Sequence, residues 1–104
     1  MPQFDVHRNT GCQRETIPFV VIVQSALYDD YRRRVVAPLV RKELLGPVAD
    51  PGFNPTFTIE SLDVVLHPLE MVSIPISQLG VCVGSLSEAG DQIIRAIDQL
   101  LCRV

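Results

Sequence analysis

The chain has 104 residues, which suits a single domain spanning residues 1–104, because domains commonly run to roughly 100–150 residues. Hydrophobic residues make up 47% and charged residues 20%, the balance of a folded globular protein and not of a disordered chain. The net charge of −3 excludes a general attraction to phosphates, so we expect no direct binding of nucleic acid.

The first part of the sequence predicts two strands. Residues 3–7 alternate, with Phe4 and Val6 on one side, as in a half-buried strand. A loop over 8–16 follows. The β-branched run IPFVVIVQS at 17–25 is typical of a central strand.

The middle of the chain predicts a third strand, a helical turn and a long loop. After a turn at 29–30, apolar sequence resumes at 35–39, where Pro38 favours an edge position or a bulge because it cannot donate to a ladder. Residues 41–45 could form one helical turn, and the segment 46–55, which contains several Gly and Pro residues, predicts a loop.

Two β features follow this loop. Residues 56–66 alternate on either side of a turn near Ser61, which predicts a hairpin. The stretch MVSIPISQL at 71–79 alternates apolar with small residues as far as Ile76. Because Pro75 cannot donate to a ladder, this strand is predicted to lie at an edge or an interface.

The pattern of the last segment predicts a helix. Ser85 and Glu88 have the spacing of a capping box. Apolar residues then recur at three- and four-residue spacing, namely Ile93, Ile94, Ile97, Leu100, Leu101 and Val104. Strands followed by a helix favour the α+β class, and we expect the apolar end of this helix to be presented to a partner.

Few residues indicate catalysis or metal binding. His7 and His67 are isolated, so each is predicted to be a surface or loop residue, and we expect no metal and no cofactor. Cys12, Cys82 and Cys102 lack paired ligand spacing, which predicts neither a disulfide framework nor a zinc site. The sequence shows no leader and no apolar run near the roughly 20 residues that span a bilayer, which predicts a cytoplasmic protein without membrane contact.

The densest basic patch is YRRR at 31–34. Its arginines could pair within a solvated turn with Asp29, Asp30 or Glu43, or they could contact an anion on a partner protein or on RNA. The sequence leaves both interpretations open.

Four stretches, taken in order, resemble the CcdB toxin family of bacteria along nearly the whole chain. They are MPQFDVHRN, VIVQSALYDDYRRRVVAPL, PLEMVSIPISQLG and SLSEAGDQIIRAIDQLL. The resemblance implies an α+β fold, with an SH3-like barrel or antiparallel sheet of the CcdB and MazF type, a small accessory sheet and one C-terminal helix. It also implies a homodimer whose interface includes Met71, Ser73, Pro75 and Ile97.

The resemblance implies a toxin that is not an enzyme, from a type II toxin–antitoxin system. CcdB-like toxins bind the A subunit of DNA gyrase and trap its complex with cleaved DNA. The residues implied for gyrase binding are Leu27, Tyr28, Asp98, Leu101, Cys102, Arg103 and Val104. A CcdA-like antitoxin would neutralise the toxin and co-repress their operon with it. Its candidate docking residues are Arg8, Asn9, Arg14, Val48 and Phe53.

Two alternatives stay open. The family ends in Trp-Gly-Ile, a tip replaced here by Cys102-Arg103-Val104, and Trp is a typical binding anchor. A homologue that keeps the fold but no longer poisons gyrase is therefore one alternative. The other is a MazF-like ribonuclease, in which Arg33 or Arg34 would hold the scissile phosphate near Thr56 or Ser61.

Overall fold

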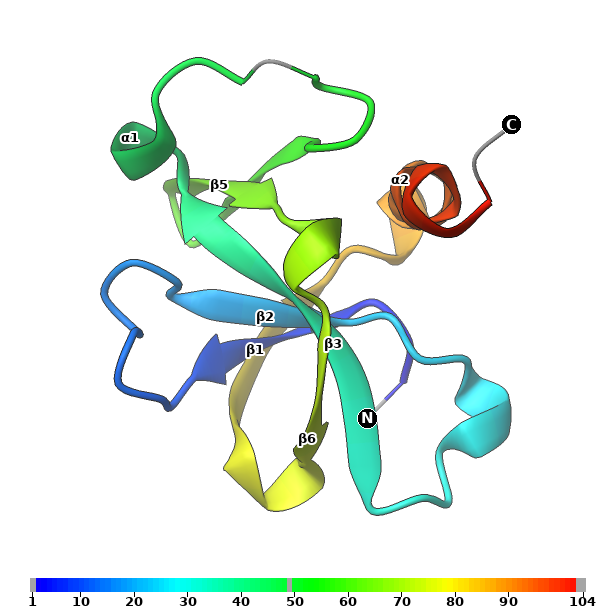
Figure 1. Cartoon of the computed structure of the whole chain (residues 1–104). Helices are drawn as coiled ribbons and strands as arrows, with labels where there is room; N and C mark the ends of the chain where they lie inside the picture. The colour runs from blue at the N-terminus through cyan, green and yellow to red at the C-terminus, as the bar shows by residue number, and fades with distance from the viewer. Residues whose placement is uncertain (1, 49, 103–104) are drawn as a thin grey trace.

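The computed structural model describes residues 2–48 and 50–102. Its strands are β1 (Asp5–Asn9), β2 (Phe19–Ile22), β3 (Arg33–Arg41), β4 (Thr56–Ile59), β5 (Leu62–Leu66), β6 (Val72–Pro75) and β7 (Leu79–Ser85). Its α-helices are α1 (Lys42–Leu45) and α2 (Gly90–Leu101). Short 3-10 helices lie in the connections, namely η1 (Ala26–Tyr28), η2 (Pro68–Glu70), η3 (Ile76–Gln78) and η4 (Ser87–Ala89). The strands form one curled antiparallel sheet in the order β4-β5-β3-β2-β1-β7, with β6 paired to β3 beside this path (Figure 1). The predicted α+β fold is confirmed.

The strand β2 lies in the middle of the sheet, between β1 and β3, and all four of its residues are buried. Phe19 and Val21 belong to the main core, whereas Val20 and Ile22 belong to a second cluster. Since successive side chains of a strand point to opposite faces, β2 is covered on both faces, which suits β-branched residues. The predicted central strand is confirmed.

Pro38 does not lie at an edge, because β3 has β2 on one side and both β6 and β5 on the other. The pairing with β6 ends at Val36, and the pairing with β5 begins at Leu39. Between them, the Pro38 carbonyl accepts a hydrogen bond of 3.0 Å from His67 N. The N–H and C=O of a strand residue point to the same side, so the N–H that proline lacks would face the gap between two partners. The edge prediction was wrong for this reason.

The predicted hairpin is confirmed as β4 and β5. Glu60 and Ser61 adopt φ angles of 51° and 66°, the left-handed pair that a two-residue type I′ turn requires. The predicted helical turn is confirmed as α1, which packs against β3 and β5.

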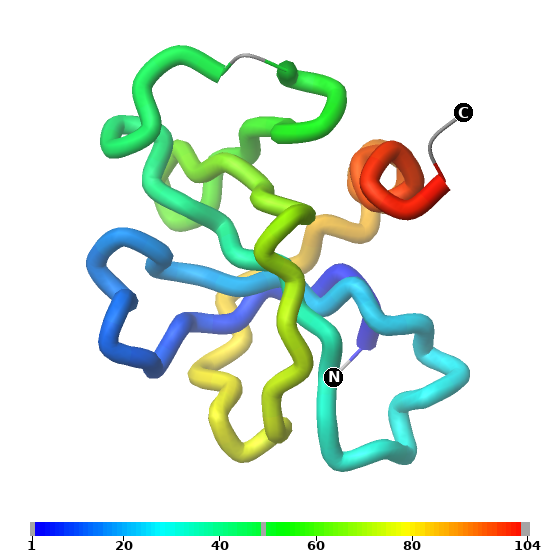
Figure 2. Tube along the Cα trace, in the orientation of Figure 1, coloured from blue at the N-terminus to red at the C-terminus, as the bar shows by residue number. Residues whose placement is uncertain are grey.

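The strand β6 pairs with β3 alone among the described strands, which confirms its predicted edge position. It ends at Pro75, so Ile76, which we predicted to continue the strand, lies in η3 instead. The chain then reverses into β7, which runs antiparallel to β1 and was not predicted (Figure 2). Gly80 and Gly84 lack the apolar side chains that would have marked β7 as a strand.

The helix α2 covers the main core, where it buries Ile93 and Ala96. Its first residue, Gly90, lies directly against the half-buried ring of Phe4. A Cβ atom at Gly90 would approach that ring to 2.7 Å, so the glycine permits the close contact between the helix and the start of the chain. The predicted core face of the helix is confirmed at Ile93.

The capping box predicted from Ser85 and Glu88 does not form. The Ser85 hydroxyl accepts a hydrogen bond of 3.1 Å from Ser87 N, and η4 precedes the helix, which begins only at Gly90. The preceding residue, Ala89, has no side chain that could cap it. Among the described residues, no helix has both the length and the apolar character needed to cross a membrane.

Candidate functional site

The loop between β2 and β3 carries η1 away from the sheet (Figure 1). Leu27 is 85% exposed and Tyr28 is 51% exposed. Both belong to the residues implied for gyrase binding. Large apolar side chains held in solvent on a projecting turn are typical of a contact surface.

Arg34 holds this loop from within. Its side chain is 4% exposed, and its guanidinium donates hydrogen bonds to the carbonyls of Tyr31 at 2.6 Å, Asp29 at 2.7 Å and Arg33 at 2.9 Å. Its Nε lies 3.9 Å from Asp29 Oδ1, too far for a hydrogen bond but close enough for an ion pair. For Arg34, pairing within the turn is therefore the correct interpretation of the basic patch.

Gln24 fastens the loop from the side of β2. Its Nε2 donates to the carbonyls of Tyr28 at 3.0 Å and Arg33 at 3.2 Å, and its Oε1 accepts from Val35 N at 3.0 Å. These contacts bridge the two ends of the loop, so η1 is presented on a fixed base. Gln24 was not predicted from the sequence, because a lone polar residue after an apolar strand carries no specific signal.

Arg33 is exposed but engaged. It donates from Nε to Ser73 Oγ at 2.9 Å and from Nη2 to the Ser73 carbonyl at 2.7 Å, which ties β3 to β6. Of the residues implied for a dimer interface, Ser73 is exposed and Pro75 is half-buried in β6. Met71 and Ile97 are partly buried against the main core.

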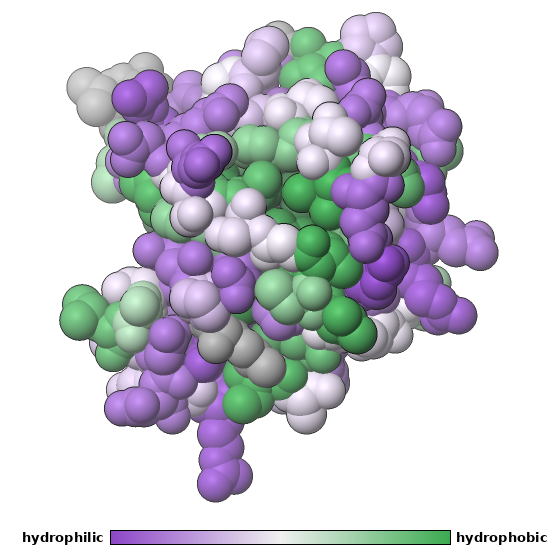
Figure 3. Space-filling model, turned by 180° about the vertical axis from the view of Figure 1, so that it is seen from behind, coloured by the Kyte–Doolittle hydropathy of each residue, from purple (hydrophilic) through white to green (hydrophobic). Residues whose placement is uncertain are grey.

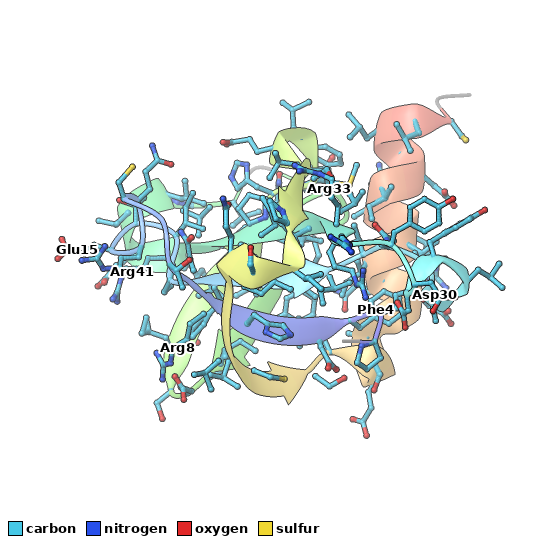
Figure 4. The ribbon with its side chains drawn as sticks, turned by 90° about the horizontal axis from the view of Figure 1, so that it is seen from below. Phe4, Arg8, Glu15, Asp30, Arg33 and Arg41 are labelled. Atoms are coloured by element: carbon cyan, nitrogen blue, oxygen red, sulfur yellow. The ribbon has the colours of Figure 1, made fainter. Side chains whose placement is uncertain are left out.

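The end of α2 carries a further part of the implied gyrase surface. Asp98 and Cys102 are exposed, and Leu101 is 67% exposed, which favours contact over core packing for this leucine. Arg103 and Val104 lie outside the described residues. Both η1 and α2 lie on the same side of the molecule in two perpendicular views (Figures 1 and 4).

Exposure alone does not single out η1. Hydrophobic residues also form a band among hydrophilic ones on the face of the molecule that is seen from behind in Figure 3. Other exposed large apolar side chains are Tyr31, Leu44, Leu45, Leu69, Val72, Val81 and Ile94. What distinguishes η1 is the combination of projecting apolar side chains with two supports, the buried Arg34 and the half-buried Gln24.

The residues expected to dock the antitoxin lie in two parts of the chain, the end of β1 with the connection after it and the loop between α1 and β4. Arg8 in β1 pairs with Glu60 of the β4–β5 turn at 2.6 Å, while Asn9 and Arg14 belong to the end of β1 and the connection that follows it. Asn9 Nδ2 donates to the Ile17 carbonyl at 2.8 Å and so helps to close that connection.

The other two candidates, Val48 and Phe53, are half-buried in the loop between α1 and β4. The loop lies partly against α2, since Gly52 shares a pocket with helix residues including Arg95 and Gln99. The five candidates therefore come from two segments that are far apart in the sequence.

The side chains considered for ribonuclease chemistry are not brought together. Arg34 is buried near the start of β3, and Thr56 lies opposite Val65, which pairs with Val40 towards the far end of β3. At about 3.3 Å per residue, Val40 and Arg34 are separated by up to roughly 20 Å along the strand. Figure 4 shows Arg33 and Arg41, the two ends of β3, well apart.

The two histidines differ in their surroundings. His67 lies in the link before η2, as predicted for a loop residue, with Nδ1 3.6 Å from Glu70 Oε2. His7 is only 4% exposed and lies within β1, so its assignment to a surface or loop was wrong. Its side chain lies on the opposite face of the sheet from Val6. Other strands and the second cluster, to which its partner Val20 belongs, cover that face.

A family model for "CcdB protein" matches residues 3–102 of the chain. The chain belongs to the CcdB family. No curated protein matches this sequence. Among solved structures, the "Mycobacterium tuberculosis toxin MazF-mt6" has a TM-score of 0.71 at 16% identity, over 91% of this chain and 93% of that one. A structure described as "Mtb toxin" has a TM-score of 0.69 at 16% identity, over 90% and 97%. This CcdB-family chain thus shares its fold with toxins of the MazF type.

Proposed function

We propose that this CcdB-family chain is the toxin of a type II toxin–antitoxin system and that it binds the A subunit of DNA gyrase and traps the complex of gyrase with cleaved DNA. The observation that carries the proposal is the family match over residues 3–102. A toxin of this kind acts by forming a complex, so the proposed activity requires no catalytic residue in the chain.

The proposed gyrase-binding surface joins η1 to the end of α2. Its residues are Leu27, Tyr28, Asp98, Leu101, Cys102, Arg103 and Val104. The exposure of Leu27, Tyr28 and Leu101 supports this choice, because most of the surface of these side chains is not buried within the chain itself. The fixed base of η1 also supports it, since a preorganised contact loses less conformational entropy on binding.

A ribonuclease is the second candidate, because the chain shares its fold with a toxin of the MazF type. Two observations count against it. The net charge of −3 opposes binding of an RNA backbone, and the guanidinium of Arg34 is committed to the carbonyls of Asp29, Tyr31 and Arg33.

The proposed partners follow from family membership. A homodimer would use Met71, Ser73, Pro75 and Ile97, and the exposed Leu69 and Val72 beside them would add apolar area. A CcdA-like antitoxin would bind at Arg8, Asn9, Arg14, Val48 and Phe53, neutralise the toxin and co-repress the operon in the bacterial cytoplasm.

The test is controlled expression in a bacterium that carries the cognate gyrase, with DNA breaks and RNA integrity followed together. The proposal expects growth arrest with DNA breaks and intact RNA, and it expects a gyrase A variant selected for survival to restore growth. Arrest with cleaved RNA and unbroken DNA would replace it with the ribonuclease. The absence of arrest by a folded protein would leave a homologue that has lost its target.

A further inference from the structure

Asp5, His7 and Cys82 form a cluster on β1 and β7 that belongs to none of the proposed binding surfaces. One potential ligand atom from each residue lies within 4.8 Å of the other two. Asp5 and His7 occupy alternate positions of β1 and therefore share a face of the sheet. They lie on the stretch between Phe4 and Arg8, both labelled in Figure 4.

An irregularity in the strand pairing brings Cys82 to this face. Val6 pairs with Gly84, so a regular ladder would place Val83 opposite His7. The register shifts between Val6 and His7, and Cys82 becomes the partner of His7 instead. Val83 packs towards the main core. Such bulges re-aim side chains and are over-represented beside functional sites.

His7 supplies a buried nitrogen that no group of the described chain satisfies. Nδ1 lies 2.9 Å from the carbonyl of Gly80, which can only accept, so the proton of a neutral ring resides on Nδ1. Nε2 is then an acceptor, and it is buried without a hydrogen-bond partner among the described residues. A backbone carbonyl that orients one nitrogen while the other stays free is the usual arrangement of a metal-binding histidine.

The other two side chains complete a set that suits zinc. Cys82 Sγ lies 3.8 Å from Asp5 Oδ2, and in tetrahedral zinc, with bonds of about 2.3 Å to sulfur and about 2.0 Å to oxygen, such atoms lie roughly 3.5 Å apart. The thiol is exposed, so an ion can reach it from solvent. A carboxylate and a thiolate would together balance the charge of a divalent cation.

We propose that Asp5, His7 and Cys82 bind a Zn²⁺ ion, with the fourth coordination position open to water or to a ligand from a partner. The thiolate favours zinc over magnesium or calcium, which prefer oxygen ligands. None of these three residues belongs to the proposed gyrase-binding surface, so the site does not depend on the proposed binding of gyrase.

The test is a titration of the full, reduced and chelator-treated protein with Co²⁺ and then Zn²⁺, followed by absorption and by thermal unfolding. A thiolate ligand to Co²⁺ gives a charge-transfer band in the near ultraviolet, and Zn²⁺ should displace the Co²⁺ and raise the Tm. The diagnostic variant is Cys82→Ser. Its matched control is the double variant Cys12→Ser/Cys102→Ser, which removes the other two exposed thiols.

The proposal expects the band in the natural chain and in the control but not in Cys82→Ser. Because loss of an outer-shell partner alone typically costs 10–100-fold in metal affinity, loss of the sulfur ligand should weaken Zn²⁺ binding by about 100-fold or more. Asp5→Asn, which keeps the size of a half-buried side chain, should weaken it as well. No Zn²⁺ binding by the natural chain at micromolar concentration, or a band that survives in Cys82→Ser and disappears in the control, would overturn the proposal.

Discussion

Arg34 Nη2 donates a hydrogen bond of 2.7 Å to the backbone carbonyl of Asp29. Together with the bond from Arg34 Nη1 to the Tyr31 carbonyl, this bond makes the buried Arg34 side chain the internal support of the loop that presents Leu27. The proposed gyrase contact therefore depends on a residue that does not itself face the target.

Replacing Arg34 by Ala should loosen this loop and destabilise the fold. The change removes three hydrogen bonds from a buried charged group and leaves loop carbonyls unpaired, which should lower the free energy of unfolding by about 3 kcal/mol. Urea unfolding measures the change, and limited proteolysis within the loop reports its mobility. The matched control is the exposed neighbour, Arg33→Ala, for which a loss within about 1 kcal/mol is expected. Equal losses in the two variants would contradict the supporting role of Arg34.

Replacing Leu27 by Ser should separate binding from stability. Because the side chain is 85% exposed, the free energy of unfolding should change by no more than about 0.5 kcal/mol. Growth arrest should weaken, since the apolar contact with gyrase would be lost. Leu44→Ser is the control, because Leu44 is 58% exposed in α1 and lies outside the proposed surface. If both variants arrest growth as well as the natural chain, Leu27 is not a contact residue.

Ile93→Ala should be strongly destabilising. Ile93 is fully buried in the main core, and truncation of such a side chain typically costs about 2–5 kcal/mol because a cavity remains. Ile94, its neighbour on α2, is 37% exposed, so Ile94→Ala should cost far less. Thermal unfolding of both variants provides the comparison, and a larger loss for Ile94→Ala would mean that α2 turns a different face towards the core.

Gly90→Ala should destabilise the chain although alanine favours helices. The gain in helix propensity is at most about 1 kcal/mol, since that value applies to a helix interior and Gly90 is the first residue of α2. A Cβ atom 2.7 Å from the Phe4 ring must displace a side chain packed against the core, at a cost of about 1–3 kcal/mol. Gly84→Ala is a suitable control, because a Cβ atom there meets nothing within 4 Å. Unfolding midpoints of the two variants decide the matter, and a more stable Gly90→Ala would show that the ring moves aside freely.

Local patterns were sufficient to predict the elements whose signal lies in their own residues. The continuous apolar run of β2, the alternation of the hairpin and the helical spacing around Ile93 each determine one element. The edge prediction for Pro38 was wrong because β3 tolerates a proline at the point where its pairing with β6 ends and its pairing with β5 begins. That point is set by three strands together and not by one. Long-range pairing of this kind cannot be read from a single segment.

The sequence likewise allowed some residues of the candidate site to be predicted and not others. Family resemblance indicated Leu27 and Leu101, both of which are exposed in the structure. It gave no indication of Gln24 or of the contact between His7 and Cys82, which are separated along the sequence and meet only through the pairing of β1 with β7. Supports and clusters of this kind become visible once the register is known.

The most direct test of gyrase poisoning is a DNA cleavage assay with purified gyrase from the same organism, supercoiled plasmid, ATP and this protein, stopped with denaturant. We predict that linear plasmid accumulates with the natural chain and falls with Leu27→Ser, while Leu44→Ser behaves as the natural chain does. A folded protein that yields no linear plasmid, in a reaction where a quinolone does, would contradict gyrase poisoning and show that this CcdB-family chain has kept the fold without that target.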